Sequence, residues 1–323
     1  MLYPLVFKPI LKKMIWGGSA ICPFKEIEPV REGIGESWEL SHVNGNFSIV
    51  AEGALEGRSL DELVGMYGAK LLGHSIMERF GSVFPLLIKF IDAHDDLSIQ
   101  VHPDDELAMK RHNSFGKTEM WYVIHAEEGA SLYSGFKQQI DADEYVRRVK
   151  DNTITEVLQR YEVKAGDVFF LPAGRVHAIC SGCFIAEVQQ TSDITYRIYD
   201  YNRKDADGNG RELHTEQAKD AIDYTVYPDY RTHYDPVANE TVELAGCKYF
   251  TANLLDLDKT IMKNVEQLDS FIVYICVEGS AVVVDDKFNR LYVCRGETLL
   301  VPADTEIIAI APSPRAKFLE VYI

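Results

Sequence analysis

The sequence has little cysteine, a shortage of basic residues and no long apolar run. Its six cysteines are scattered over 323 residues, which excludes a small scaffold stapled by disulfides. No apolar stretch reaches the roughly 18 residues of a membrane-spanning helix. Lysine and arginine total 33 against 50 aspartates and glutamates, a formal net charge of −17. This balance argues against a nucleic-acid partner and against attachment to an anionic membrane.

The length and the N-terminal residues indicate a cytoplasmic chain of two domains. The chain is about twice as long as an ordinary domain, and its 46% hydrophobic and 26% charged residues are typical of globular proteins. The apolar N-terminal stretch is interrupted by Lys8 and Pro9 and lacks the basic start and small-residue cleavage site of a signal peptide. A chain of this length needs neither a disulfide nor a metal merely to fold.

One pair of cysteines has the spacing of half a zinc ribbon, namely Cys180 and Cys183 in CSGC. The sequence contains no second CxxC that would complete such a site. The pair therefore predicts free, partly buried thiols.

Turn residues and periodicity predict a β-rich chain with a few helices. Residues 59–81 are predicted to be helical, because Ser59 and Glu62 fit a capping box before apolar residues that fall mostly on one face. Residues 104–112 begin with acids and end with cations, as the helix dipole favours, and residues 141–160 predict one or two short helices. From residue 161, glycine and proline separate short alternating runs, which is typical of a sandwich or barrel.

A spaced frame of glycine and proline occurs twice, 130 residues apart. GDVFFLPAGRVH (166–177) and GETLLVPADTEI (296–307) share the first glycine and the proline, but His177 is replaced by Ile307. We interpret the two segments as copies of one β-barrel unit, the second without its polar ligand.

Polar side chains gather around the first copy. Gln100 and His102 lie two apart in LSIQVHP, so on a strand they point to the same face as Ser98. Glu119 opens the next strand, and His177 follows the PAG turn. Taken singly, composition favours each His as a buried structural residue and Glu119 as an exposed carboxylate. Together, an amide oxygen, two imidazoles and a carboxylate suit Zn²⁺ or another borderline divalent ion.

These residues carry a resemblance to a known family. Gly166–His177 matches the second cupin motif fully, whereas the first motif has Gln100-x-His102 in place of His-x-His and its Glu is delayed to position 119. This departure, with IWGG, GESWELS, LLIKFIDA, LSIQVHPDD, GKTEMWYV and QQTSDITYRIYDYNR, resembles the type I mannose-6-phosphate isomerases, above all their short bacterial form. The resemblance covers nearly the whole chain and is weakest in 205–260 and at the C-terminus.

The resemblance implies an all-β dominated fold of two cupin (jelly-roll) barrels, with helical insertions around the first. It implies a catalytic domain at 1–240 and a degenerate C-terminal domain at 241–323 without metal ligands. It further implies one zinc ion per chain, bound by Gln100, His102, Glu119 and His177. Substrate-binding and catalytic residues in the first barrel would be Ser98, Lys117, Glu187 and Arg197. Position 181, where cupins carry a non-ligand Asn, is Ser.

The implied reaction interconverts mannose 6-phosphate and fructose 6-phosphate through a cis-enediol. We expect Glu187 to move the proton, or alternatively to orient Arg197, ten residues later on a neighbouring strand. Arg197 and Lys117 suit a phosphate or a developing oxyanion, although an arginine also forms purely structural salt bridges. Lys89 either lines the cavity or snorkels.

Two other functions compete, a cupin Fe(II) oxygenase and a non-catalytic sugar sensor. An amide ligand such as Gln100 favours redox-free zinc over iron, and a sensor would have lost a ligand in the first barrel. Trp16 and Trp38 are expected to be packing residues. The sequence predicts no particular oligomeric state.

Overall fold

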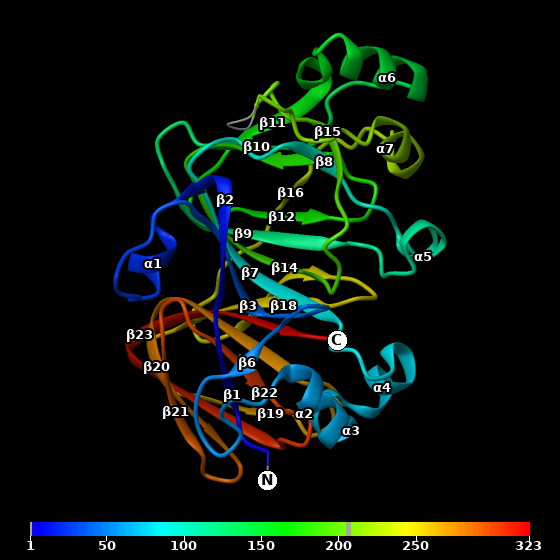
Figure 1. Ribbon diagram of the computed structural model, residues 1–323. Helices are drawn as coiled ribbons and strands as arrows, with labels where there is room; N and C mark the ends of the chain where they lie inside the picture. The colour runs from blue at the N-terminus through cyan, green and yellow to red at the C-terminus, as the bar shows by residue number, and fades with distance from the viewer. Residues whose placement is uncertain (1, 205–207) are drawn as a thin grey trace.

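A computed structural model describes residues 2–204 and 208–323. The chain forms two stacked β-barrels, with the C-terminal strands in the lower one (Figure 1). Neighbouring strands in the three large sheets pair antiparallel. The predicted β-dominated, cupin-type fold is confirmed.

Two facing sheets form the first barrel. The five-stranded sheet has the order β11-β10-β13-β8-β15, with bounds β8 Ile99–Val101, β10 Ser131–Phe136, β11 Leu158–Glu162, β13 His177–Ile179 and β15 Tyr196–Tyr199. The seven-stranded sheet has the order β16-β12-β9-β14-β7-β2-β3, with bounds β2 Ile10–Gly18, β3 Ile34–Leu40, β7 Leu86–Ala93, β9 Glu119–Ala126, β12 Val168–Leu171, β14 Cys183–Gln190 and β16 Arg231–Thr232.

One nine-stranded sheet forms the second barrel. Its order is β17-β18-β23-β20-β22-β1-β6, with β19 on β23 and β21 on β20. The bounds are β1 Leu5–Lys8, β6 Ile49–Val50, β17 Thr241–Gly246, β18 Thr251–Leu257, β19 Ile261–Asn264, β20 Ile272–Asp285, β21 Arg290–Cys294, β22 Thr298–Val301 and β23 Ile307–Tyr322. The N-terminal strands β1 and β6 thus pair with strands that follow residue 240. A separate hairpin pairs β4 His42–Val43 with β5 Asn46–Phe47.

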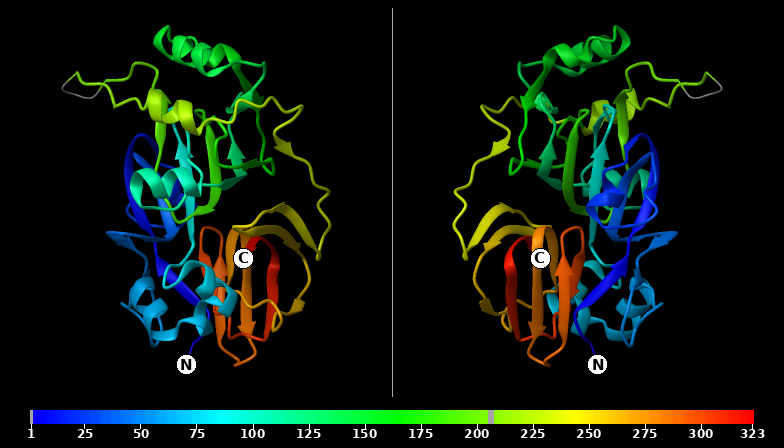
Figure 2. Two further views of the ribbon diagram at one scale, coloured as in Figure 1. Left: turned by 90° about the vertical axis from the view of Figure 1, so that its right-hand side faces the viewer. Right: turned by 90° about the vertical axis from the view of Figure 1, so that its left-hand side faces the viewer.

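The helices lie outside the barrels. Their bounds are α1 Ile21–Phe24, α2 Leu60–Tyr67, α3 Ala69–Leu72, α4 His74–Phe80, α5 Asp105–His112, α6 Ala142–Lys150, the 3₁₀ helix η1 Ile154–Val157 and α7 Thr215–Ala221. Helices α6 and α7 pack on the outer face of the five-stranded sheet, at the end of the molecule far from the second barrel (Figure 2). Within the described ranges, no helix combines the length and apolar character needed to cross a membrane.

Strands β7 and β14 are buried along their whole length, and their alternate residues face two different cores. Ile88 and Phe90 belong to a core shared with the second barrel, whereas Ile91 packs inside the first barrel with Trp121. Because side chains alternate along a strand, the residue between Ile88 and Phe90 must point into the first barrel. That residue is Lys89, so the strand pattern itself places a cation inside the barrel.

The segment 59–81, predicted to be helical, forms three short helices rather than one continuous helix. The capping box of Ser59 and Glu62 is present at the start of α2, but Gly68 and Gly73 separate the helices with φ of 49° and 104°. A Cβ on Gly73 would lie 2.0 Å from the carbonyl oxygen of Asp269. The glycine therefore ends the helix and admits the turn before β20.

Replacing this glycine tests that close approach. Gly73→Ala should lower the free energy of unfolding by at least about 2 kcal/mol, through a disfavoured φ and a backbone clash. Gly65→Ala in α2, where a Cβ meets nothing within 4 Å, should instead raise it by about 0.5–1 kcal/mol. Urea unfolding measures both, and equal stability of the two variants would contradict the explanation.

Candidate active site

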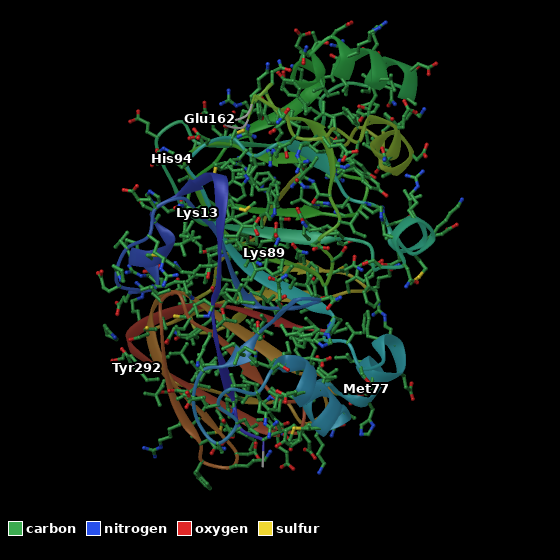
Figure 3. All side chains as sticks on the ribbon, in the orientation of Figure 1. Lys13, Met77, Lys89, His94, Glu162 and Tyr292 are labelled. Atoms are coloured by element: carbon green, nitrogen blue, oxygen red, sulfur yellow. The ribbon has the colours of Figure 1, made fainter. Side chains whose placement is uncertain are left out.

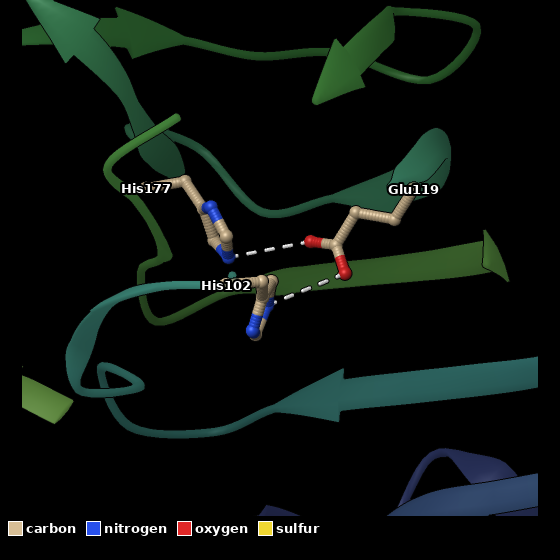
Figure 4. Close-up of side chains that lie close together, drawn as sticks. All are labelled: His102, Glu119 and His177. Atoms are coloured by element: carbon tan, nitrogen blue, oxygen red, sulfur yellow. Dashed lines mark ion pairs between the residues drawn. The ribbon is translucent and has the colours of Figure 1, made fainter. Parts of the chain in front are cut away.

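Three buried side chains, His102, Glu119 and His177, meet inside the first barrel. His102 follows β8, Glu119 opens β9 and His177 opens β13, so both facing sheets contribute. Their ligand atoms lie within 4.8 Å of one another. The Nε2 atoms of His102 and His177 are 3.5 Å and 3.3 Å from the two carboxylate oxygens of Glu119 (Figure 4).

The two imidazoles are oriented by backbone carbonyls. Nδ1 of His102 lies 2.9 Å from Ile194 O, and Nδ1 of His177 lies 2.8 Å from Arg175 O. Because a carbonyl only accepts, each Nδ1 carries the proton and each Nε2 keeps its lone pair. Burial lowers the pKa of His177 to about 3 and that of His102 well below its usual value. Both rings are therefore neutral near pH 7.

The cluster fits a zinc ion. Gln100 pairs with His177 across β8 and β13, and its side-chain amide is 3.3 Å from Nε2 of His177. Rotating the Gln100 amide by 180° about its last side-chain bond exchanges its nitrogen and oxygen, so that the oxygen faces Nε2 of His177. Nε2 of His102 and Oε1 of Glu119 are buried without a hydrogen-bond partner. Two imidazole nitrogens, a carboxylate and an amide oxygen form a donor set that zinc accepts.

Lys117 pairs with the cluster from the segment that precedes β9. Its Nζ lies 3.0 Å from Glu119 Oε2, and both side chains are buried. Burial raises the pKa of Glu119, and Lys117 opposes that rise. The carboxylate of Glu119 thus contacts Lys117 as well as the two histidines.

A second buried carboxylate, Glu187, lies beside this cluster. In register across four strands stand Trp121, Glu187, Lys89 and Trp38. Lys89, at the centre of Figure 3, has its Nζ 3.0 Å from Glu187 Oε1, while Trp121 Nε1 donates to Oε2 at 2.9 Å. Burial favours a neutral Glu187, but Lys89 and Lys117 outweigh it and lower the pKa. Glu187 is therefore ionised near pH 7.

A cavity of about 360 Å³ adjoins these groups. Of the residues singled out from the sequence, the structure gathers five on its wall, namely Ser98, Gln100, Lys117, Glu187 and Arg197. Lys89 also lines the cavity, in an ion pair rather than snorkelling to solvent. Trp16 and Trp38, expected only to pack, line it as well. That expectation missed their second role because β2 and β3 join the sheet through distant pairings.

Glu187 and Arg197 do not lie on neighbouring strands, contrary to the expectation. β14 belongs to the seven-stranded sheet and β15 to the five-stranded sheet. Residues 191–195 cross from one sheet to the facing one, so the two side chains approach the cavity from opposite walls.

Sequence reasoning missed several residues that line the cavity, namely Met14, Glu36, Asp193, Thr195, Arg211 and His214. Asp200 holds Arg211 through two hydrogen bonds, from Nε at 2.7 Å and from Nη2 at 2.5 Å. Nη1 of Arg197 donates to Glu212 O at 3.1 Å, and its Nε has no hydrogen-bond partner. The only sequence signal for Arg211 was a cation in the polar loop NRKDADGNGRE, which carries no information on what it faces.

The cysteines add no second metal site. All six are free thiols, and Cys180 and Cys183 are buried, as expected. Among the residues that the structure describes, His102, Glu119 and His177 form the single group of His, Cys, Asp or Glu side chains close enough to hold a metal ion.

Paired cupin-type barrels, with a buried His–Glu–His cluster beside a cavity rich in cations, define an enzyme of the metal-binding cupin class. The sequence profile of the phosphomannose isomerase type I catalytic domain matches residues 5–129. Mannose-6-phosphate isomerase ManA of Bacillus subtilis is 36% identical over 303 residues, 93% of each chain. The mannose-6-phosphate isomerase of Streptococcus mutans is 42% identical over 220 residues, 68% of this chain and 67% of the other.

The fold comparison agrees with the sequence comparison. The crystal structure of the mannose 6-phosphate isomerase from Bacillus subtilis matches with a TM-score of 0.88 and 29% identity, over 100% of both chains. The chain belongs to the type I mannose-6-phosphate isomerase family and is an isomerase that acts on a sugar phosphate. The family resemblance recognised in the sequence is thereby confirmed.

The ion pair between Lys89 and Glu187 has a testable energetic consequence. Lys89→Met leaves a buried carboxylate unpaired, so the free energy of unfolding at pH 7 should fall by about 3–5 kcal/mol. Because the pKa of Glu187 is lowered on folding, the pairing stabilises the protein above the unfolded-state pKa. The difference between variant and wild type should therefore shrink as the pH falls below 4.5. Denaturant unfolding across pH measures it, and a pH-independent difference would contradict the assignment.

Proposed function

We propose that this chain interconverts mannose 6-phosphate and fructose 6-phosphate through a cis-enediol, with one zinc ion held by Gln100, His102, Glu119 and His177. The observation that carries the proposal is the set of buried, unpartnered ligand atoms of His102 and Glu119, joined through Gln100 to the cavity wall. Zinc, when bound, would supply Lewis-acid stabilisation of negative charge on the substrate oxygens.

The chain itself would move the proton between the two carbons. Isomerisation removes a proton from the carbon beside the carbonyl and returns it to the neighbouring carbon. Glu187 is the carboxylate that we assign to this step, because it lines the cavity and is ionised. Its hydrogen bond from Trp121 and its ion pair with Lys89 fix its position. The same partners make it a weak base, so positioning must supply much of its effect.

Cations on the cavity wall would bind the phosphate and the developing oxyanion. Arg197 lines the cavity from β15, and Arg211 lines it from the loop after β15. Burial, and to a lesser extent the charge of Arg211, lowers the pKa of Arg197. Such close cations repel each other until an anion lies between them. Lys117 sits at the other end, beside Glu119, and is assigned to the oxyanion. Ser98 offers a hydroxyl to the substrate.

The domain roles and the cellular location belong to the same proposal. Residues 1–240 would carry the whole active site, and residues 241–323, together with strands β1 and β6, would form a degenerate barrel without ligands. Ile307 stands where the first repeat has His177, which supports this division. A cytoplasmic location is supported by six free thiols. Membership of an isomerase family argues against the oxygenase and the sensor.

Removing the metal tests the zinc assignment. Treatment with a chelator should abolish formation of fructose 6-phosphate from mannose 6-phosphate in a coupled assay, and Zn²⁺ should restore it. His177→Ala should reduce bound zinc well below one per chain, because it deletes one buried ligand. His233→Ala, at an exposed histidine, is the matched control and should retain the zinc. Full turnover by metal-free, folded protein would contradict the zinc assignment.

Exchange of the substrate proton tests the base. Glu187→Gln should lower kcat by about 10²–10⁴-fold with KM nearly unchanged, since an amide still accepts from Trp121 but cannot take a proton. NMR should also show that exchange of the substrate's C2 hydrogen with deuterated water is lost. Asp193→Asn, at the other carboxylate near the β15 wall, should retain the exchange. The reverse result would transfer the role to Asp193.

A further inference from the structure

The segment that carries Lys117 and Glu119 is held by a carboxylate outside the cavity. Asp105, the first residue of α5, accepts a hydrogen bond from Gly116 N at 3.0 Å. A Cβ on Gly116 would lie 2.5 Å from the backbone of Asp104, so the segment touches the start of α5 directly. Lys117 N donates to Pro103 O at 3.1 Å. The backbone just before the metal cluster is thus fixed against one helix start.

Gln190 fixes the next residue of the segment and is itself fixed by Asp105. Its side-chain oxygen accepts from Thr118 N at 2.8 Å, and its backbone N donates to Thr118 O at 3.1 Å. Its Nε2 donates to Asp105 Oδ1 at 3.0 Å, the same atom that accepts from Gly116. Both backbone groups of Thr118, which stands between Lys117 and Glu119, therefore bond to Gln190, and the Thr118 N–H depends on the side-chain amide that Asp105 orients.

The other oxygen of Asp105 is bound by the second barrel. The hydroxyl of Tyr249, in the turn between β17 and β18, donates to Oδ2. The Tyr249 ring is buried, and the guanidinium of Arg79 lies 5.6 Å from its centre. Lys248 Nζ is 3.8 Å from the same oxygen but largely exposed. One hydroxyl thus connects the second barrel to the carboxylate that orients the active-site segment.

We propose that Tyr249 and Asp105 are positioning residues, through which the second barrel sets the place of Lys117 and Glu119 and so the zinc affinity and turnover of the first. This inference rests on the proposed function, because it assigns zinc to Glu119. The hydroxyl touches neither the metal ligands nor the cavity, so its effect must pass through Asp105, Gln190 and the backbone of residues 116–118. Hydrogen-bond partners beyond the ligands commonly change metal affinity or activity by about 10–100-fold.

Tyr249→Phe tests the inference, because it removes one hydroxyl and leaves the ring in place. The zinc dissociation constant, measured by competition with a chromophoric chelator, should rise about tenfold, and kcat at saturating zinc should fall while KM is unchanged. Asp105→Ala should do at least as much. In that background, adding Tyr249→Phe should have no further effect, since both act through one bond. Asp105→Asn, which keeps an acceptor for Gly116 and a donor for Tyr249, should restore most of the affinity.

Tyr274→Phe is the matched control in the same barrel. Its hydroxyl also donates to a carboxylate, Glu320, at 2.9 Å, and is buried. This variant should lower Tm but leave zinc affinity and kcat unchanged. Wild-type zinc affinity and kcat in Tyr249→Phe, or an equal loss in both variants, would overturn the inference. A wild-type protein with no isomerase turnover at any zinc concentration would instead overturn the proposed function, and the zinc dissociation constants would still decide the positioning role.

Discussion

Two carboxylates buried inside the first barrel govern its architecture, because an unpaired buried charge costs several kcal/mol. Glu187 is paired with Lys89 on the neighbouring strand, and Glu119 is paired with Lys117, which lies just before the same strand. The pairing of Glu187 is complete, with a tryptophan donating to its second oxygen. The pairing of Glu119 is incomplete, because two neutral imidazoles face it with lone pairs. A divalent cation bound between these groups would supply the charge that this arrangement lacks.

The second barrel also contains a buried carboxylate paired with a lysine, and there the hydrogen bonding of the carboxylate is complete. Glu320 stands in register between Tyr274 and Asn253, and both donate to it at 2.9 Å and 3.1 Å. Lys263 completes the set at 2.5 Å and 2.7 Å. Every lone pair of this carboxylate is therefore used, whereas the first barrel leaves ligand atoms unpartnered. The polar row around Glu320 is thus fully paired within the second barrel, whose repeat of the glycine–proline frame has Ile307 in place of His177.

The sequence predicted the parts of the site that are local in the chain. The glycine–proline frame placed His177 at a strand start, and strand alternation placed Gln100 and His102 together, because both depend on neighbours within a dozen residues. It could not place Glu187 and Arg197 on facing sheets, since that depends on which strands pair across the chain. The same limit hid Trp38 and Arg211. The break between α3 and α4 depends on Gly73 meeting Asp269, almost 200 residues away.

The two barrels are joined by an apolar core and by the hydrogen bond between Tyr249 and Asp105, which make different contributions. The apolar core shared by the barrels buries surface and stabilises the pair without fixing any one atom. Hydrogen bonds are directional, so the contact of Tyr249 with Asp105 can set the position of a segment to a fraction of an ångström. Catalysis and metal binding are sensitive to displacements of that size. The second barrel can therefore influence the chemistry of the first through one directional bond, which a purely apolar interface would not provide.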